Sequence, residues 1–196
     1  MCDLEKHLDK IMFFSKAIMG KSFHHGWPHV ERVLNVAHKI SQKEGGHYPI
    51  IKAAVFLHDI GRYVERSLNS HHAVLSADIA KEFLKSIGVC DYHISEITHI
   101  IISHSFTSGI KPRSLEAKIV SDADKIDALG AVGVIRAFLF GESNGRSPND
   151  TLQHFIDKLF KLPDLMYTNT GKIIARKRVK IMKVVYEELL NELSIK

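Results

Sequence analysis

The 196-residue chain has few cysteines and no long apolar run, and both absences exclude classes of protein. Its two cysteines, Cys2 and Cys90, cannot build a disulfide framework, and neither belongs to a CxxC pair that would bind zinc or exchange thiols. We therefore expect plain thiols in a reducing compartment. Apolar runs such as 53–57 are far shorter than the ~20 residues of a membrane-spanning helix, and the N-terminus has no recognisable export signal. We expect a cytoplasmic protein that does not span a membrane.

The composition is that of an ordinary folded domain. It is 45% hydrophobic and 25% charged, which excludes a disordered or low-complexity chain. A chain of this length can bury about 70% of its unfolded surface in a single core. We therefore expect one domain over residues 1–196.

Apolar residues recur at helical spacing along almost the whole chain, and no alternating pattern is long enough to predict a strand. Prolines mark several helix starts, and glycines mark several helix ends. The predicted fold class is all-α, a single bundle of about nine helices. These helices cover roughly residues 4–12, 28–44, 49–61, 73–87, 94–104, 112–127, 131–140, 152–159 and 173–190. The segment 141–150, GESNGRSPND, predicts a surface loop or a mobile lid.

The basic residues are concentrated near the C-terminus. The net charge is +5, and the segment 158–183 holds eight basic residues against one acid. Such a segment either forms a solvated helix face or attracts polyanions, and both interpretations stay open. Only Phe160 and Tyr167 fall among these basic residues, which is a poor pattern for binding single-stranded nucleic acid.

Histidine is abundant, with 13 residues, and eleven of them lie between His24 and His104. His58 and Asp59 are adjacent near the end of a predicted helix, where two neighbouring side chains can bind one ion. His29 lies in the first turn of another predicted helix, among apolar residues that hold this helix in the core. A polar side chain at that position can point into a cavity.

Three acids interrupt the mostly apolar stretch from 119 to 135, in the sequence SDADKID at 121–127. Carboxylates in such surroundings are costly unless they bind a cation or have another partner. For Asp122 and Asp127 we expect helix capping or an ion pair. Asp124 is the candidate ligand.

His29, His58–Asp59 and Asp124 follow the order of an H…HD…D signature, and the chain resembles the HD-domain metal-dependent phosphohydrolases. The surrounding sequences also match the family's local patterns: HVERV from 29, FLHDI from 56 and DADKIDALGA from 122. Further segments are similar to a bacterial and archaeal subgroup of small stand-alone HD hydrolases: HAVLSA from 72, AKIVSDAD from 117 and LPDLM from 162. The resemblance covers roughly residues 20–190.

The resemblance implies a single HD domain with a metal-site core at about 20–140 and C-terminal helices at 150–193 packed on it. It implies one divalent ion of the Mn, Fe, Co, Ni or Mg kind, with a second ion left open. The implied ligands are His29, His58, Asp59 and Asp124. The ion would activate a water that hydrolyses a phosphoester or phosphoanhydride, and the implied substrate is a nucleotide or a similar small phosphorylated metabolite. The enzyme would be a nucleotide phosphatase or pyrophosphohydrolase.

Four further residues are candidates for the same site. Arg62 and Lys125 are predicted to bind substrate phosphates, the alternative being that both are surface cations. Some HD families have a glutamate at the position of Arg62 that assists the water, so the arginine indicates phosphate binding instead. His72 and His104 are predicted catalytic residues. Related HD subfamilies use histidines in similar elements either to bind a second metal or to contact phosphate and protonate the leaving group. The alternative is a neutral histidine bonded to a backbone carbonyl. We expect the other histidines of this region to be surface or structural residues: His24, His25, His38, His47, His71, His93 and His99.

Two other functions remain as alternatives. The first is a sensor that binds a nucleotide or alarmone without turnover, although a degenerate sensor would be expected to lose a metal ligand. The second is a protein that associates with nucleic acid through the segment 158–183. A homo-oligomer is left open.

Overall fold

The computed structural model describes residues 3–105 and 108–193, and the regular elements in these ranges are all helical. This confirms the all-α fold class. The chain divides into two compact units, Met1–Ala123 and Asp124–Lys196. Helix α7 (Leu115–Asp127) is continuous through the division. The single-domain organisation stays a prediction, and each unit is described below by itself.

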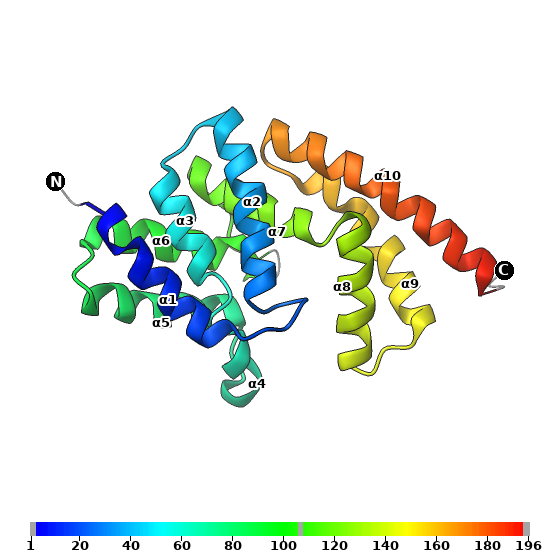
Figure 1. Ribbon diagram of the computed structural model, residues 1–196, viewed down its shortest axis with the longest axis horizontal. Coiled ribbons are helices and arrows are strands. Elements are labelled where there is room, and N and C mark those ends of the chain that lie inside the picture. Colours follow the sequence, from blue (N-terminus) through cyan, green and yellow to red (C-terminus); the bar gives the residue numbers. More distant parts are fainter. Residues whose placement is uncertain (1–2, 106–107, 194–196) are drawn as a thin grey trace. The chain divides into compact units, whose positions relative to one another are not determined.

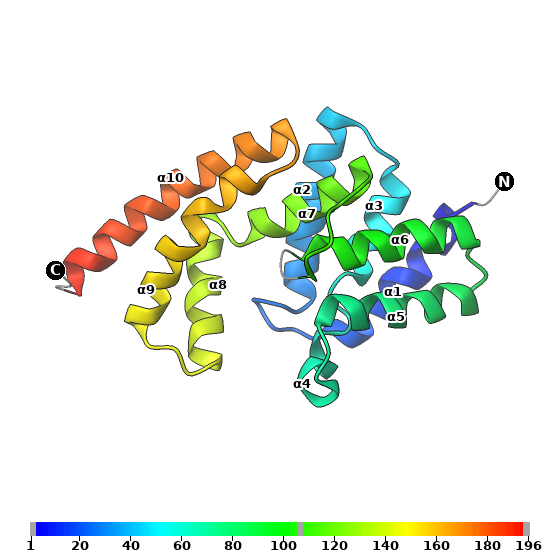
Figure 2. The same cartoon turned by 180° about the vertical axis from the view of Figure 1, so that it is seen from behind.

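The first unit is built around helix α3 (Tyr48–Leu57). Most of its residues are buried, as expected for a helix that is apolar on nearly all sides. Four other helices pack against it (Figures 1 and 2), namely α1 (Leu8–Met19), α2 (Trp27–Glu44), α5 (His72–Ser86) and α6 (Asp91–His104). The unit also contains η1 (Glu5–His7), η2 (Arg62–Val64), α4 (Glu65–Leu68) and the first part of α7. The chain that leaves α3 therefore enters a buried region, where His58 and Asp59 are almost fully covered.

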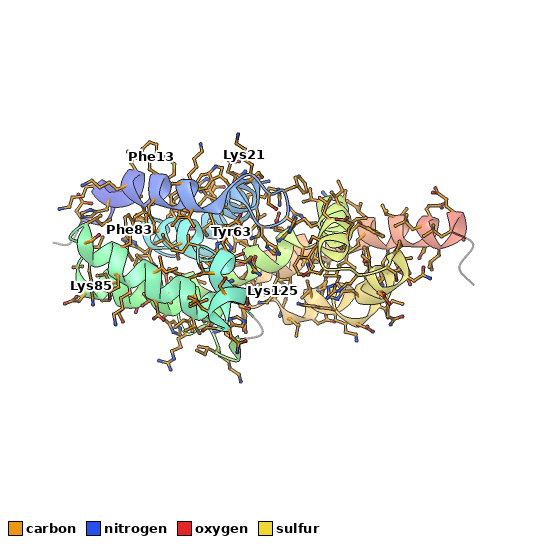
Figure 3. All side chains as sticks on the ribbon, turned by 90° about the horizontal axis from the view of Figure 1, so that it is seen from below. Phe13, Lys21, Tyr63, Phe83, Lys85 and Lys125 are labelled. Carbon is orange, nitrogen blue, oxygen red and sulfur yellow. The ribbon has the colours of Figure 1, made fainter. Side chains whose placement is uncertain are left out.

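The segment after α3 is attached to its neighbours by specific contacts. The backbone N–H of Gly61 donates a hydrogen bond to Ser76 Oγ on α5, at 2.9 Å. The hydroxyl of Tyr63, which Figure 3 labels, donates to the carbonyl of Met19 at the end of α1. These bonds hold the turn that carries Asp59 against two helices.

Several predicted element boundaries were wrong. Neither η2 nor α4 was predicted, because helices of one turn leave no detectable periodicity. Helix α7 begins at Leu115, three residues after the predicted start. Most of the predicted loop 141–150 is helical, since α8 (Gly130–Ser143) and α9 (Pro148–Asp157) leave only 144–147 between them.

Cys90 is disulfide-bonded, so the expected free thiol is wrong for this residue. The spacing argument excluded a framework of several bridges and a CxxC pair, but it did not exclude a single bridge. Cys2 lies outside the described residues.

The second unit packs α8 against α9 and α10 (Asn169–Glu192), with η4 (Leu159–Leu165) beside the last two. The Phe155 ring is fully buried, and its neighbouring rings are those of Phe138, Phe160 and Tyr186. Asp127 and Arg136 form a buried ion pair, with Oδ2 and Nη1 2.7 Å apart. This confirms the expectation that Asp127 serves an ion pair.

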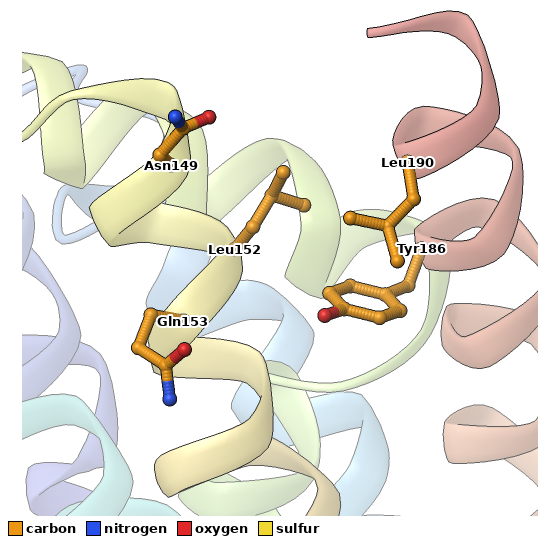
Figure 4. A pocket seen from close by; sticks show the side chains of 5 residues that line it. All are labelled: Asn149, Leu152, Gln153, Tyr186 and Leu190. Atoms are coloured by element: carbon orange, nitrogen blue, oxygen red, sulfur yellow. The ribbon is translucent and has the colours of Figure 1, made fainter. Parts of the chain in front are cut away.

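A pocket between α9 and α10 is lined by Asn149, Leu152, Gln153, Tyr186 and Leu190 (Figure 4). No carboxylate, imidazole or thiol is among these lining residues, so the pocket supplies no ligand of the kinds predicted above. Among the described residues, no helix has the length and apolar character needed to cross a bilayer.

Candidate metal centre

His58 and Asp59 follow directly on the last residue of α3, and His58 is its C-cap. The helix ends here, as the motif analysis predicted, so the two adjacent side chains can serve one site. Their exposed fractions are 0% for His58 and 1% for Asp59. Gly61 is required in this turn, because a Cβ there would lie 2.5 Å from the backbone nitrogen of Ser76.

His29 reaches His58 from the start of α2. This helix begins after Gly26, whose close contact with the backbone of Ser22 leaves no room for a side chain. The Nε2 atoms of His29 and His58 are 3.2 Å apart, and both residues are fully buried. The Nδ1 of His58 lies 2.8 Å from the carbonyl oxygen of Val55. Because a carbonyl can only accept, the neutral form of His58 carries its proton on Nδ1 and directs the Nε2 lone pair at His29.

Asp59 lies at the centre of a group of imidazoles. Its Oδ2 is 3.9 Å from His29 Nε2 and 3.8 Å from His58 Nε2. Its Oδ1 is 3.7 Å from His72 Nε2 and 3.7 Å from His104 Nε2. One carboxylate therefore faces nitrogens from four segments of the first unit.

Arg62 binds both oxygens of Asp59. Its Nε donates to Oδ2 at 2.8 Å and its Nη2 donates to Oδ1 at 3.1 Å. Burial by itself raises the pKa of Asp59, but the positive charge of Arg62, followed by the influence of His58, outweighs burial and holds this pKa well below its usual range. Asp59 is therefore an anion throughout the neutral range. Arg62 belongs to η2, the short helical turn that follows the end of α3.

His72 is held between two charged groups. Its Nε2 lies 3.1 Å from Arg62 Nη2, and its Nδ1 lies 3.2 Å from Glu65 Oε1. The backbone N–H of His72 donates to the same Glu65 oxygen at 3.2 Å. Burial is the main cause that lowers the pKa of His72 to about 4, and Arg62 also lowers it while Asp59 raises it. At neutral pH the ring is uncharged, with Nδ1–H donating to Glu65 and Nε2 accepting from Arg62.

The cluster contains ligand sets for a divalent ion. In the first unit, the ligand atoms of His25, His29 and Asp59 lie within 4.8 Å of one another, and so do those of His58, Asp59 and His104. The Nδ1 of His104 lies 2.5 Å from the carbonyl oxygen of Ile101, and its Nε2 lies 3.7 Å from Asp59 Oδ1. Imidazole nitrogens and a carboxylate are the donors that Mn, Fe, Co and Ni accept, so the residues fit a metal of this kind.

The structure brings six of the eight predicted site residues into one cluster of the first unit: His29, His58, Asp59, Arg62, His72 and His104. The other two are on α7. Asp124 is the first residue of the second unit and is half-buried. Lys125 is buried, and its Nζ lies 4.6 Å from the centre of the Tyr167 ring.

Two members of the cluster were missed by the sequence analysis. His25 was expected to be a surface or structural residue, but its Nδ1 lies 3.7 Å from Asp59 Oδ2. Glu65 was not considered at all, although it contacts His72. No signal was available for either residue, because His25 precedes its helix and Glu65 follows a turn of unpredicted geometry.

Comparison with known proteins finds HD-domain proteins among those similar to this chain. A family model described as the HD domain matches residues 26–129. The protein YpgQ of Bacillus subtilis is 33% identical over 186 residues, which cover 90% of this chain and 89% of YpgQ. A crystal structure of YpgQ in complex with ADP matches with a TM-score of 0.80 at 28% identity, covering 96% of both chains. An HD-superfamily hydrolase from Bacillus thuringiensis matches with a TM-score of 0.75 at 32% identity, covering 99% of this chain and 100% of that one.

A more distant likeness is to ribonuclease Y. The enzyme of Thermobifida fusca is 24% identical over 139 residues, which are 71% of this chain. The match spans only 23% of that ribonuclease.

Proposed function

Because the chain belongs to the HD-domain family of hydrolases, we propose that it is a metal-dependent phosphohydrolase acting on a nucleotide or a similar small phosphorylated metabolite. The observation that carries this proposal is the buried cluster around Asp59, in which the Nε2 atoms of His29 and His58 approach to 3.2 Å. Buried imidazoles and a carboxylate with fixed orientations support a role as metal ligands rather than as packing residues.

We assign one divalent ion to His29, His58 and Asp59, with Asp124 as the fourth ligand on the basis of the motif. Manganese, iron, cobalt, nickel and magnesium are the candidate ions. Bound here, such an ion polarises a phosphate oxygen and makes a water more acidic. The bond from His58 Nδ1 to Val55 orients the ring before the ion arrives, which favours binding.

We assign the neighbouring side chains to phosphate binding, proton transfer and positioning. Arg62 carries a permanent charge beside Asp59, and its side chain is 24% exposed, so it can also contact a substrate phosphate. Lys125 is the second proposed phosphate ligand. His104 is the proposed catalytic residue that contacts the phosphate and protonates the leaving group, and its Nε2 lies 3.7 Å from Asp59 Oδ1. His72 accepts a hydrogen bond from Arg62 and orients its guanidinium, which makes His72 a positioning residue.

A nucleotide substrate is supported by the similarity to YpgQ, whose crystal structure contains ADP. The bond that is cleaved distinguishes two activities. Release of inorganic phosphate indicates a nucleotide phosphatase, whereas release of pyrophosphate from a triphosphate indicates a pyrophosphohydrolase.

The test is a substrate screen on the full chain after removal of metals with a chelator. Mn, Mg, Co, Ni or Fe is added back singly, and phosphate and pyrophosphate are measured with nucleoside mono-, di- and triphosphates, sugar phosphates and single-stranded RNA. The Asp59→Ala variant is the control. We expect turnover of at least one nucleotide by the wild type and none above background by the variant.

The other outcomes separate the alternatives. No turnover above the Asp59→Ala control with any metal refutes the enzyme. Tight nucleotide binding without turnover then supports a sensor, and cleavage or salt-dependent binding of RNA alone supports the nucleic-acid alternative.

A further inference from the structure

Helix α10 packs on the second unit with one side and exposes the opposite side. It contacts α8 and η4 (Figure 1), and its buried residues include Ala175, Val179 and Met182. On the other side, residues three or four positions apart form one continuous line along the helix. All six are exposed, and together they are called the outer stripe of α10: Ile173, Lys177, Ile181, Val184, Glu188 and Asn191.

The middle of the outer stripe is apolar. Ile181 is 47% exposed and Val184 is 60% exposed, and the two side chains are neighbours on the helix surface. Ile173, at the start of the stripe, is 70% exposed. Removing such side chains from water is favourable, so the stripe gains stability when a second apolar surface covers it.

Two opposite charges lie symmetrically about this apolar centre. Lys177 lies four residues before Ile181, and Glu188 lies four residues after Val184. Neither Lys177 nor Glu188 has an ion-pair partner among the residues that the structure describes. A binding partner of the stripe must therefore supply an acid near Lys177 and a base near Glu188.

A second copy of this chain meets both requirements when its α10 lies antiparallel on the outer stripe. A two-fold axis midway between residues 181 and 184 places Ile181 against Val184 of the partner subunit. Because the spacing to each charge is equal, the same axis places Lys177 against Glu188 of the partner subunit. We propose that the outer stripe of α10 is the interface of a homodimer in which the two α10 helices pair antiparallel.

The distribution of charge along α10 excludes other arrangements. Parallel pairing would set Lys177 against a second Lys177, and Glu188 against a second Glu188. A polyanion, such as RNA or an anionic membrane, would be attracted by Lys177 but repelled by Glu188 in the same stripe. The inference concerns a surface of the second unit and goes beyond the proposed function, so its test does not depend on turnover.

The test is sedimentation velocity of the full chain over a range of protein concentrations. Lys177→Glu replaces both Lys177–Glu188 contacts of the dimer with like charges, and Glu188→Lys does the same with the opposite sign. Lys81→Glu is the matched control, because it makes the same charge change at an exposed lysine of α5. The substituted side chains are all exposed, so each variant should fold, as circular dichroism will show.

We expect a reversible dimer for the wild type and for Lys81→Glu. The dissociation constant should be about tenfold higher, or more, for Lys177→Glu and for Glu188→Lys. An equimolar mixture of these two variants should form a heterodimer with a dissociation constant close to that of the wild type. In this mixture every carboxylate of the stripe again faces a lysine, which only pairing between two chains can achieve.

Each contrary result overturns the proposal. A dimer that is unchanged in both Lys177→Glu and Glu188→Lys associates through another surface. A mixture that stays as weak as its components excludes antiparallel pairing, and an equal loss in Lys81→Glu shows a general effect of net charge. A wild type that is monomeric at every concentration has no such interface. Binding of RNA or anionic vesicles that is lost in Lys177→Glu would then assign the stripe to a polyanion.

Discussion

The buried carboxylate of Asp59 lies at the centre of the cluster and contacts several of its side chains. An anion with 1% exposure is costly unless cations or donors surround it, and Asp59 has the guanidinium of Arg62 and a group of imidazoles around it. The sequence motif predicted Asp59, His29 and His58 as metal ligands, and the structure brings these three side chains together, while their ligand roles stay a prediction. It was not sufficient to predict His25, because this residue lies outside the helical pattern and only the fold brings it to the carboxylate.

Glu65 controls the orientation of His72, so its removal should affect turnover. In Glu65→Ala, His72 loses the acceptor for both its Nδ1–H and its backbone N–H, and the guanidinium of Arg62 loses a fixed partner. We expect turnover to fall by about tenfold, with the affinity for the divalent ion unchanged. Steady-state kinetics and metal titration measure the two effects separately.

Two further variants check this explanation. Glu65→Gln should retain most of the activity, because its amide oxygen can still accept from Nδ1. Glu82→Ala removes an exposed glutamate of α5 and should behave as wild type. Equal activity of Glu65→Ala and Glu82→Ala would contradict the positioning role.

At the scale of elements, the end of α3 determines the geometry of the centre. The sequence predicted a helix that begins near Pro49 and stops before Gly61, and this was enough to place His58 and Asp59 at a helix end. The route of the chain after Asp59 was not predictable, because η2 and α4 are too short to produce a periodic pattern. Their positions depend on tertiary contacts such as the bond from Gly61 to Ser76.

Gly61→Ala should therefore destabilise the protein. The added Cβ would lie 2.5 Å from the backbone nitrogen of Ser76 and 2.7 Å from Leu75 Cβ, so the turn and α5 must separate. We expect the free energy of unfolding to fall by about 1–3 kcal/mol. Urea denaturation measures this change, and a stability equal to that of the wild type would show that the turn has room for a side chain.

The start of α3 provides a pH-dependent prediction. His47 is its N-cap residue, and the backbone N–H of His47 donates to Glu116 Oε1 at 2.8 Å. Burial raises the pKa of Glu116, but the hydrogen bonds from the backbone of His47 and from Ser114 are among the contacts that outweigh burial and lower this pKa from 4.5. The folded protein therefore favours the charged form, whose contribution to stability is present above pH 4.5 and is lost as the pH falls through the lowered value.

Glu116→Gln should reduce the free energy of unfolding by about 0.5 kcal/mol at pH 7, after allowance for solvent screening of a half-buried carboxylate. The difference from wild type should shrink below pH 4.5, where Glu116 becomes protonated. Urea denaturation at several pH values measures it, and Glu187→Gln on the exposed face of α10 is the control. A difference that is independent of pH would contradict the assigned cause.

At the scale of the whole molecule, helical periodicity predicted the fold class because most helices have an apolar face. The main error was at 141–150, where glycine, serine and proline indicated a loop. The segment contains a start signal for α9, since Ser147 and Asp150 form a capping box. The composition of 141–150 indicated a loop, whereas the capping box indicated a helix start. Residues 148–150 are helical, as the capping box indicates.

The basic segment 158–183 also has a partly structural explanation. Arg178 donates to the carbonyl of Ile126 at 2.7 Å, and Lys183 Nζ lies 5.5 Å from the centre of the Phe160 ring. Such contacts are long-range in the sequence, so charge counting could not separate these residues from a surface that attracts phosphates.

The measurement that tests the central claim most directly records ion binding and product release on the same samples. His58→Ala removes a proposed ligand, whereas His38→Ala removes an exposed histidine of α2 and serves as the control. The proposed function predicts that wild type and His38→Ala bind the ion and release phosphate or pyrophosphate, and that His58→Ala loses both and matches metal-free wild type. Full turnover by His58→Ala, or by metal-free wild type, would contradict it.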